Sequence, residues 1–262
     1  MLNNRIIAIQ ADAIEKINPL TDTTLLLAQE AQKRKYQIYW FEPKDLSLIG
    51  KKLLAKVKKI KFLKDKKKFY TVEKQKRFDI SKAKFILIRQ NPPFGMNYFN
   101  STLLLDYVKN KTKIINDPES IRNTSEKLFS LNFIDLMPPT IFTKSFDEIQ
   151  KFFLRYKNIV IKPVNGYGGK GILFIKKLNK KFIKNYLKKS EHIMVQKFLP
   201  SIKKGDKRVF IINGKVKGAI RRIPKKKSNL SNLGQGGKAY KTMLNKKEKQ
   251  ISILVAKKLK KA

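Results

Sequence analysis

The sequence of 262 residues contains no cysteine, a single histidine and few acidic residues. Without cysteine there can be no disulfide, thiolate nucleophile or cysteine-ligated zinc, and a reducing compartment fits this composition. No apolar run approaches the roughly 20 residues of a membrane-spanning helix. The first apolar run, residues 6–9, is too short for a signal peptide. The sequence therefore predicts a cytoplasmic protein without a membrane partner.

Negative charge is scarce, with 19 acidic residues against 61 lysines and arginines, for a net charge of +42. Such a charge attracts nucleic acids through their phosphates. However, only nine of the basic residues are arginine. Arginine is the side chain that most often makes bidentate hydrogen bonds to phosphates and bases. The lysines also run through the whole chain without forming one stripe. We therefore expect non-specific attraction to polyanions at low salt and no specific nucleic-acid partner, with a basic nucleic-acid-binding protein as an alternative.

The order of the predicted elements indicates an α/β domain followed by an α+β domain. A strand over 4–11, a helix capped by Asp22 and a strand over 37–43 predict a parallel layer, which strands at 84–90 and 113–117 extend. The lysine-rich residues 51–79 are either a hairpin or a loose excursion. The later pattern predicts strands within 138–143, 159–164, 171–177, 192–200 and 207–214, helices over 145–157 and near the end of the chain, and a mobile loop over 224–241. The domains expected are 1–121, 122–200 and 201–262.

The stretch IVIKPVNGYGGKGILFIKK holds four glycines, Gly166, Gly168, Gly169 and Gly171, between two apolar segments. Their spacing matches the dinucleotide fingerprint, but that fingerprint needs a helix after the loop, and ILFIKK is typical of a strand. Two strands joined by a glycine loop predict a hairpin lid whose bare N–H groups can cover a triphosphate. Lys162 on the incoming strand would add positive charge; the alternative is an ordinary hairpin turn with an exposed lysine.

Two later segments suit a nucleotide as well. HIMVQKFLP ends in Gln196, Lys197, Phe198 and Leu199, whose backbone groups could meet an adenine edge, or could simply lead into a proline turn. Asp206 and Arg208 stand two apart before a strand, which places them on one face. Asp206 could accept from a ribose and Arg208 could brace a phosphate; equally, the two could form a surface ion pair worth little.

These residues together resemble the bacterial glutathione synthetase family of the ATP-grasp superfamily. The resemblance rests on NDPESIRNTSEKLF, NPPF after ILIR, IVIKPVNGYGGKGI, VQKFLPSIKKGDKRV and RRIP, in that order and nearly from end to end. It implies an N-terminal parallel domain followed by an ATP-grasp domain. It also implies an enzyme that joins γ-glutamylcysteine to glycine through an acyl phosphate, using ATP with Mg²⁺ or Mn²⁺, in a homo-oligomer. Another ATP-grasp carboxylate–amine ligase is the alternative within the same superfamily.

The resemblance also implies roles for individual residues. Lys127 and Lys162 would contact the nucleotide phosphates under Gly166 to Gly171, residues 196–199 would form the adenine hinge, and Asp206 would hold the ribose. Arg208 and Arg222 would face the acyl phosphate, and Arg222 would also bind the peptide substrate. The remaining substrate residues would be Arg89, Asn232, Gly236 and Gly237.

The sequence departs from the family pattern at three places. Leu230 stands where the family has an arginine, and Asn91 where it has an acidic residue. The family's closing strands, with an aspartate and a Glu-x-Asn segment that hold magnesium, have no counterpart, since Asp206 and Glu248 are the only acidic residues after residue 200. We therefore expect an ATP-grasp domain that lacks its last strands, no protein ligand for the metal, and little ligase activity.

Overall fold

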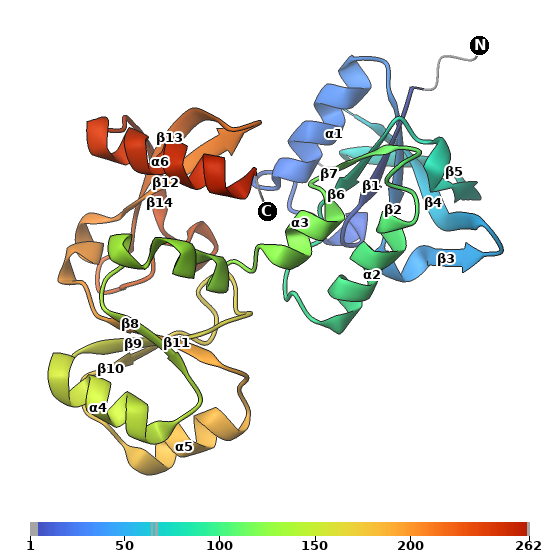
Figure 1. The fold of residues 1–262 in the computed structure, drawn as a ribbon. Coiled ribbons are helices and arrows are strands. Elements are labelled where there is room, and N and C mark those ends of the chain that lie inside the picture. Colours follow the sequence, from blue (N-terminus) through green and yellow to red (C-terminus); the bar gives the residue numbers. More distant parts are fainter. Residues whose placement is uncertain (1–4, 64, 66–67, 261–262) are drawn as a thin grey trace. The chain divides into compact units, whose positions relative to one another are not determined.

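The computed structural model describes residues 5–63, 65 and 68–260. The chain forms two compact units, Met1–Asn123 and Thr124–Ala262, and each is described by itself (Figure 1). Of the segments predicted from sequence, residue 4 of the first strand and residues 64, 66 and 67 of the lysine-rich stretch lie outside the described residues. Among those described, no helix has both the length and the hydropathy needed to cross a membrane.

The first unit is built on a seven-stranded sheet in the order β3-β4-β2-β1-β6-β7, with β5 also paired to β4. Strands β2, β1, β6 and β7 are parallel, as predicted, and the lysine-rich stretch forms the antiparallel hairpin β4–β5. The strands are β1 (Ile6–Gln10), β2 (Gln37–Phe41), β3 (Leu46–Ile49), β4 (Lys52–Phe62), β5 (Tyr70–Asp79), β6 (Phe85–Ile88) and β7 (Lys113–Ile115).

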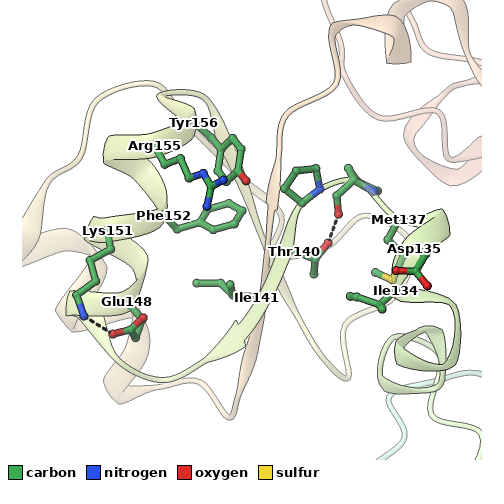
Figure 2. Close-up of a pocket in the computed structure, with 12 residues that line it drawn as sticks. Ile134, Asp135, Met137, Thr140, Ile141, Glu148, Lys151, Phe152, Arg155 and Tyr156 are labelled. Atoms are coloured by element: carbon green, nitrogen blue, oxygen red, sulfur yellow. Dashed lines mark hydrogen bonds and ion pairs between the residues drawn. The ribbon is translucent and has the colours of Figure 1, made fainter.

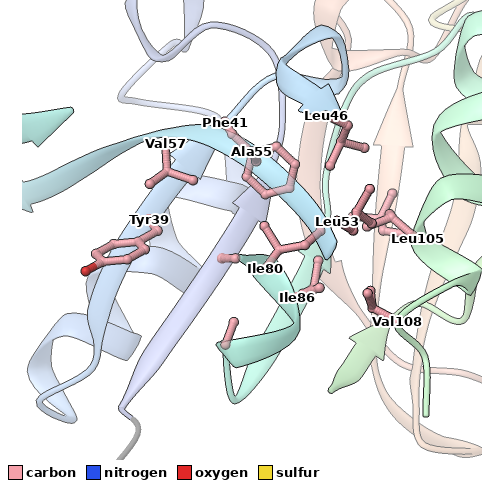
Figure 3. Close-up of a cluster of buried hydrophobic side chains, with 13 residues drawn as sticks. Tyr39, Phe41, Leu46, Leu53, Ala55, Val57, Ile80, Ile86, Leu105 and Val108 are labelled. Atoms are coloured by element: carbon pink, nitrogen blue, oxygen red, sulfur yellow. The ribbon is translucent and has the colours of Figure 1, made fainter. Parts of the chain in front are cut away.

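Helices cover this sheet, and local sequence explains where they begin. The Asp22 side chain accepts from the Thr24 N–H at 2.6 Å, which confirms the predicted N-cap of α1. Leu53, Ile86 and Leu105 meet in one fully buried cluster, in which strands β4 and β6 pack against α2 (Figure 3). The helices are α1 (Thr23–Lys33), α2 (Met96–Asp106) and α3 (Pro118–Asn123), with short 3₁₀ turns η1 (Ile14–Lys16), η2 (Pro43–Asp45) and η3 (Ile80–Lys82).

The second unit contains a four-stranded sheet in the order β10-β9-β11-β8, with helices α4 and α5 packed on one face (Figure 1). Ser145 and Asn179 cap these helices, each accepting from a backbone N–H three residues on. The elements are η4 (Leu128–Leu136), β8 (Thr140–Thr143), α4 (Phe146–Tyr156), β9 (Ile159–Pro163), β10 (Leu173–Ile175), α5 (Lys180–Lys188) and β11 (Ile193–Lys197).

A three-stranded antiparallel sheet, β12-β13-β14, completes the second unit and packs against α6. The prediction of a mobile loop over 224–241 was wrong at its end, because residues 238–242 form β14, paired with β13 from Ile223 to Ala219. The elements are η5 (Pro200–Lys204), β12 (Asp206–Ile212), β13 (Lys215–Ile223), η6 (Leu233–Gln235), β14 (Lys238–Thr242) and α6 (Lys246–Leu259).

Candidate active site

One face of the four-stranded sheet forms the floor of the candidate site. Along β9, Ile159 and Ile161 point into the core under α4 and α5, so Val160 and Lys162 lie on the opposite face. The registers place Phe174, Val160, Gln196 and Thr140 side by side across β10, β9, β11 and β8. Lys162 stands diagonally from Gln196, within reach of a long side chain.

Two lysines enter a polar pocket of about 330 Å³ above this floor. The Lys127 ammonium donates to the backbone oxygens of Gly166 at 2.5 Å and Val164 at 3.2 Å. The Lys162 ammonium donates to Gln196 Oε1 at 2.5 Å. Burial, and secondarily the charge of Lys127, lower the pKa of Lys162. Only the exposed Glu126, 3.7 Å from Lys127, offers a carboxylate to this pair within the described chain. The pocket therefore has surplus positive charge, which suits a polyphosphate.

The glycine loop covers this pocket. Strands β9 and β10 pair antiparallel, Leu173 with Ile161, so the predicted hairpin is confirmed. Gly168, Gly169 and Gly171 have φ values of 61°, 84° and 72°, which side chains rarely adopt. A Cβ on Gly171 would also lie 2.9 Å from Pro163 Cγ. Gly168 accepts from Gln235 Nε2 at 3.3 Å, so the lid touches the loop before β14.

An apolar pocket of about 240 Å³ adjoins the polar one. Phe174 and Phe198 meet edge to face with ring centroids 5.9 Å apart, and Val160 and Leu199 line the same pocket. The N–H groups of Lys197 and Phe198 already donate to Pro139 and Asn158. Among the described residues the Leu199 N–H has no such acceptor, so it can still donate to a ligand in this pocket.

Asp206 lines the apolar pocket and holds Arg222. The two residues are opposite each other on β12 and β13. The Arg222 guanidinium makes a bidentate ion pair with the carboxylate, in which Nε and Nη2 each donate to one oxygen at 2.8 Å. The alternative of an Asp206–Arg208 ion pair was wrong, because Arg208 is exposed and the partner of Asp206 is Arg222. A carboxylate has further lone pairs, so Asp206 can still accept from a ribose hydroxyl.

We predict that Asp206→Asn destabilises the protein by about 1–3 kcal/mol, since the Arg222 side chain is 13% exposed and would lose its charged partner. The exposure of Asp206, 36%, places the loss below that of a fully buried pair. Thermal unfolding measures it. The control is Glu30→Gln, which removes the exposed Arg34–Glu30 pair and should change stability by about 0.5 kcal/mol or less. Equal effects of both substitutions would contradict the prediction.

Arg89 belongs to the first unit. It follows β6 and donates to the hydroxyls of Thr24 and Thr23 at 3.1 and 2.7 Å, at the start of α1. Nearby, Gln10, Gln90 and Ser101 are buried and bonded to one another at the carboxyl ends of β1 and β6. This end of a parallel layer is where α/β domains usually bind ligands.

The structure thus gathers most of the site residues predicted in the second unit. The polar pocket is lined by Lys127, Lys162, Gly166, Gly168, Gly169, Gln196 and Asn232. The apolar pocket is lined by Lys162, Gln196, Lys197, Phe198, Leu199, Asp206 and Asn232. The residues that line neither are Gly171, Arg208, Arg222, Gly236 and Gly237. Gly237 instead shapes the loop, because a Cβ there would lie 2.4 Å from Ser231 O.

Sequence reasoning missed several residues of the site, among them Val160 and Phe174, which line the apolar pocket, and Thr140, which bonds to Gln196. For Val160 the sequence did contain a signal, because side chains alternate along a strand and Val160 therefore lies on the same face as Lys162. The neighbours Thr140 and Phe174 follow only from strand registers, which come from tertiary pairing.

A larger hollow of about 550 Å³ lies between α4, β8 and the end of η4 (Figure 2). None of the predicted site residues lines it. Its charged side chains are exposed, and Glu148 and Lys151 pair with each other at 2.8 Å. Thr140 belongs to this hollow and also bonds to Gln196 of the candidate site.

The described residues do not fit a carboxylate-bound divalent metal. In the part of the chain that the structure describes, no group of three or more histidine, aspartate or glutamate residues converges. Asp206 is held by Arg222, and Glu248 is held by Lys207 and by the cap of α6. Mg²⁺ usually takes one or two carboxylates besides substrate phosphates. The remaining carboxylate of these pockets among the described residues, Glu126, is exposed and paired with Lys127.

Comparison with solved structures identifies the fold. D-cycloserine synthetase DcsG superposes with a TM-score of 0.63 at 13% identity, covering 97% of this chain and 82% of that one. The ATP-grasp ligase PsnB, in complex with a precursor variant, Mg and ADP, superposes with a TM-score of 0.61 at 15% identity, covering 99% and 83%. The chain therefore has the ATP-grasp fold.

Sequence comparison gives the family. The N-terminal domain of prokaryotic glutathione synthetase matches residues 6–122, and its ATP-grasp domain matches residues 126–262. Glutathione synthetase of Mesorhizobium japonicum is 36% identical over 94% of this chain and 80% of its own length; that of Buchnera aphidicola subsp. Baizongia pistaciae is 37% identical over 94% and 78%. The chain belongs to the prokaryotic glutathione synthetase family, and is a ligase that forms a carbon–nitrogen bond with ATP.

Proposed function

We propose that this chain joins γ-glutamylcysteine to glycine at the expense of ATP. The observation that carries the proposal is the convergence of Lys127 and Lys162 beneath the glycine loop, beside an apolar pocket sized for a base. Adenine would lie between Val160, Phe174 and Leu199, and the ribose near Asp206. The phosphates would then extend into the polar pocket. Family membership supports the choice of substrates.

In this mechanism a carboxylate oxygen of the dipeptide attacks the γ-phosphorus, ADP leaves, and an acyl phosphate forms. The neutral glycine amine then attacks the acyl carbon, inorganic phosphate leaves as the peptide bond forms, and one amine proton passes to the leaving phosphate or to water. No side chain acts as nucleophile. The chain contributes positioning and positive charge, which dominate catalysis of phosphoryl transfer. Lys127 and Lys162 would neutralise the migrating phosphoryl group, and Arg222, oriented by Asp206, would face the acyl phosphate together with Arg208.

The remaining assignments extend the same proposal. Asn232 lines both pockets, and with the turn at Gly236 and Gly237 it would close over the substrates. Arg89 would be a residue that binds the peptide substrate. Mg²⁺ or Mn²⁺ is implied by the family, but because the described residues supply no carboxylate pair, the steps above rest on side chains alone. The family resemblance also supports a cytoplasmic homo-oligomer.

The test follows oxygen from substrate to product. The protein is incubated with ATP, glycine and γ-glutamylcysteine labelled with ¹⁸O in its cysteinyl carboxylate. Because weak activity is expected, mass spectrometry measures accumulated glutathione and phosphate. One labelled oxygen should appear in phosphate, and only when all three substrates are present. Glutathione without label transfer would exclude the acyl phosphate, and ligation of other peptides or amines in preference would exclude the substrate choice.

A further inference from the structure

Three hydrogen bonds link the strand β8 to Lys162, the half-buried lysine of the polar pocket. The Thr140 hydroxyl donates to the backbone oxygen of Pro138 at 2.6 Å (Figure 2). Gln196 Nε2 donates to Thr140 Oγ1 at 2.9 Å, and Gln196 Oε1 accepts from the Lys162 ammonium at 2.5 Å. Gln196 is 7% exposed, so its amide has little access to water as a substitute partner.

The direction of these bonds follows from counting protons. A threonine hydroxyl has one proton, and here it goes to Pro138, so Thr140 Oγ1 can only accept from its other neighbour. It therefore selects the NH₂ end of the Gln196 amide. The carbonyl end must then face Lys162, where a flipped amide would present N–H groups to an ammonium. Thr140 and the ammonium therefore select the same orientation of the Gln196 amide, although Thr140 does not contact the lysine directly.

We propose that Thr140 and Gln196 form an ordered relay that positions the charged Lys162 ammonium for the nucleotide phosphates. This inference rests on the function proposed above. The sequence predicts a role for the Gln196 backbone at the adenine hinge; the relay gives its side chain a second role on the phosphate side. Thr140 and Gln196 are positioning residues, and both act through Lys162.

A neutral acceptor suits this task better than a carboxylate would. The amide oxygen holds the ammonium without cancelling its charge, so the full charge remains available to a phosphate. The titratable groups lining the same two pockets are Glu126, Lys127, Tyr167, Lys170, Lys197 and Asp206. Of these, Lys127 lowers the pKa of Lys162, and phosphate binding would raise it again. ATP affinity should therefore fall as the pH rises and the lysine loses its proton.

The experiment compares Thr140→Val with Thr140→Ser, which keeps the hydroxyl. Calorimetry measures the binding of ATP, tripolyphosphate and adenosine to each folded variant. We expect Thr140→Val to weaken ATP and tripolyphosphate about tenfold and to leave adenosine within twofold, while Thr140→Ser stays within twofold for all three. Equal losses for adenosine and ATP would indicate a structural disturbance and overturn the relay. Wild-type affinities in Thr140→Val would overturn it as well.

Gln196→Glu provides a test that does not depend on the threonine variants. A carboxylate beside Lys162 competes with phosphate, so ATP affinity at pH 7.5 should fall at least tenfold. The same carboxylate raises the pKa of Lys162, so the decline of ATP affinity with pH should move to higher pH. An unchanged pH profile would overturn the relay while leaving the proposed function intact. Failure of the wild-type protein to bind ATP would overturn both.

Discussion

Lys162→Met should weaken ATP binding about 100-fold, since loss of a buried charged contact typically costs about 2–5 kcal/mol. The ammonium lies in the polar pocket with a neutral amide as its partner, so its charge is available for the phosphates. Isothermal calorimetry measures the affinity. Lys181→Met, on the exposed side of α5, is the matched control and should bind ATP as the wild type does. An affinity of Lys162→Met within threefold of wild type would contradict the nucleotide site.

The same substitution should not harm the folded state. Because the pKa of Lys162 is lowered in the folded protein, the unfolded chain binds its proton more readily and folding carries a penalty at neutral pH. That penalty disappears as the pH rises from the lowered value toward the ordinary value of 10.5. Without ATP, Lys162→Met should therefore be at least as stable as wild type at neutral pH, with an advantage that shrinks at alkaline pH. Thermal unfolding between pH 7 and 10 measures this difference, and a constant difference across that range would contradict it.

Gly205→Ala should destabilise the second unit by about 3 kcal/mol or more. Gly205 has φ 89° and ψ 174°, a conformation almost restricted to glycine. A Cβ there would lie 2.4 Å from the backbone oxygen of Arg222. The substitution would therefore push β12 away from β13 beside the Asp206–Arg222 pair. Thermal unfolding and ATP affinity should both fall.

Two glycines of the β12–β13 hairpin, Gly214 in the turn and Gly218 on β13, separate backbone strain from the clash. Gly214 has φ 73° with open space around it, so Gly214→Ala should cost about 1 kcal/mol from strain alone. Gly218 has neither positive φ nor a close neighbour, so Gly218→Ala should be nearly neutral. The expected order of loss is Gly205, then Gly214, then Gly218. If Gly205→Ala cost no more than Gly214→Ala, the close approach to Arg222 would not be significant.

Much of the architecture could be predicted because it depends on local patterns. The buried runs around Ile7 and Ile86 indicated parallel strands, and Asp22 and Ser145 stand where helix caps belong. The glycine loop was predicted as a hairpin because a β-branched segment follows Gly171. By contrast, β14 was hidden in a polar, glycine-bearing stretch. Its residues are held by pairing with β13 rather than by their own propensity.

Sequence alone determined the residue types on which the site depends: lysines and glycines near one another along the chain, no cysteine, and a motif order that indicated the family. These are properties of spacing and composition, so they can be identified without knowledge of long-range contacts. Only the tertiary structure decided that Asp206 pairs with Arg222 and that Gln196 bonds to both Thr140 and Lys162. Both depend on which residues face each other across neighbouring strands, and register between distant segments is set by packing of the whole sheet.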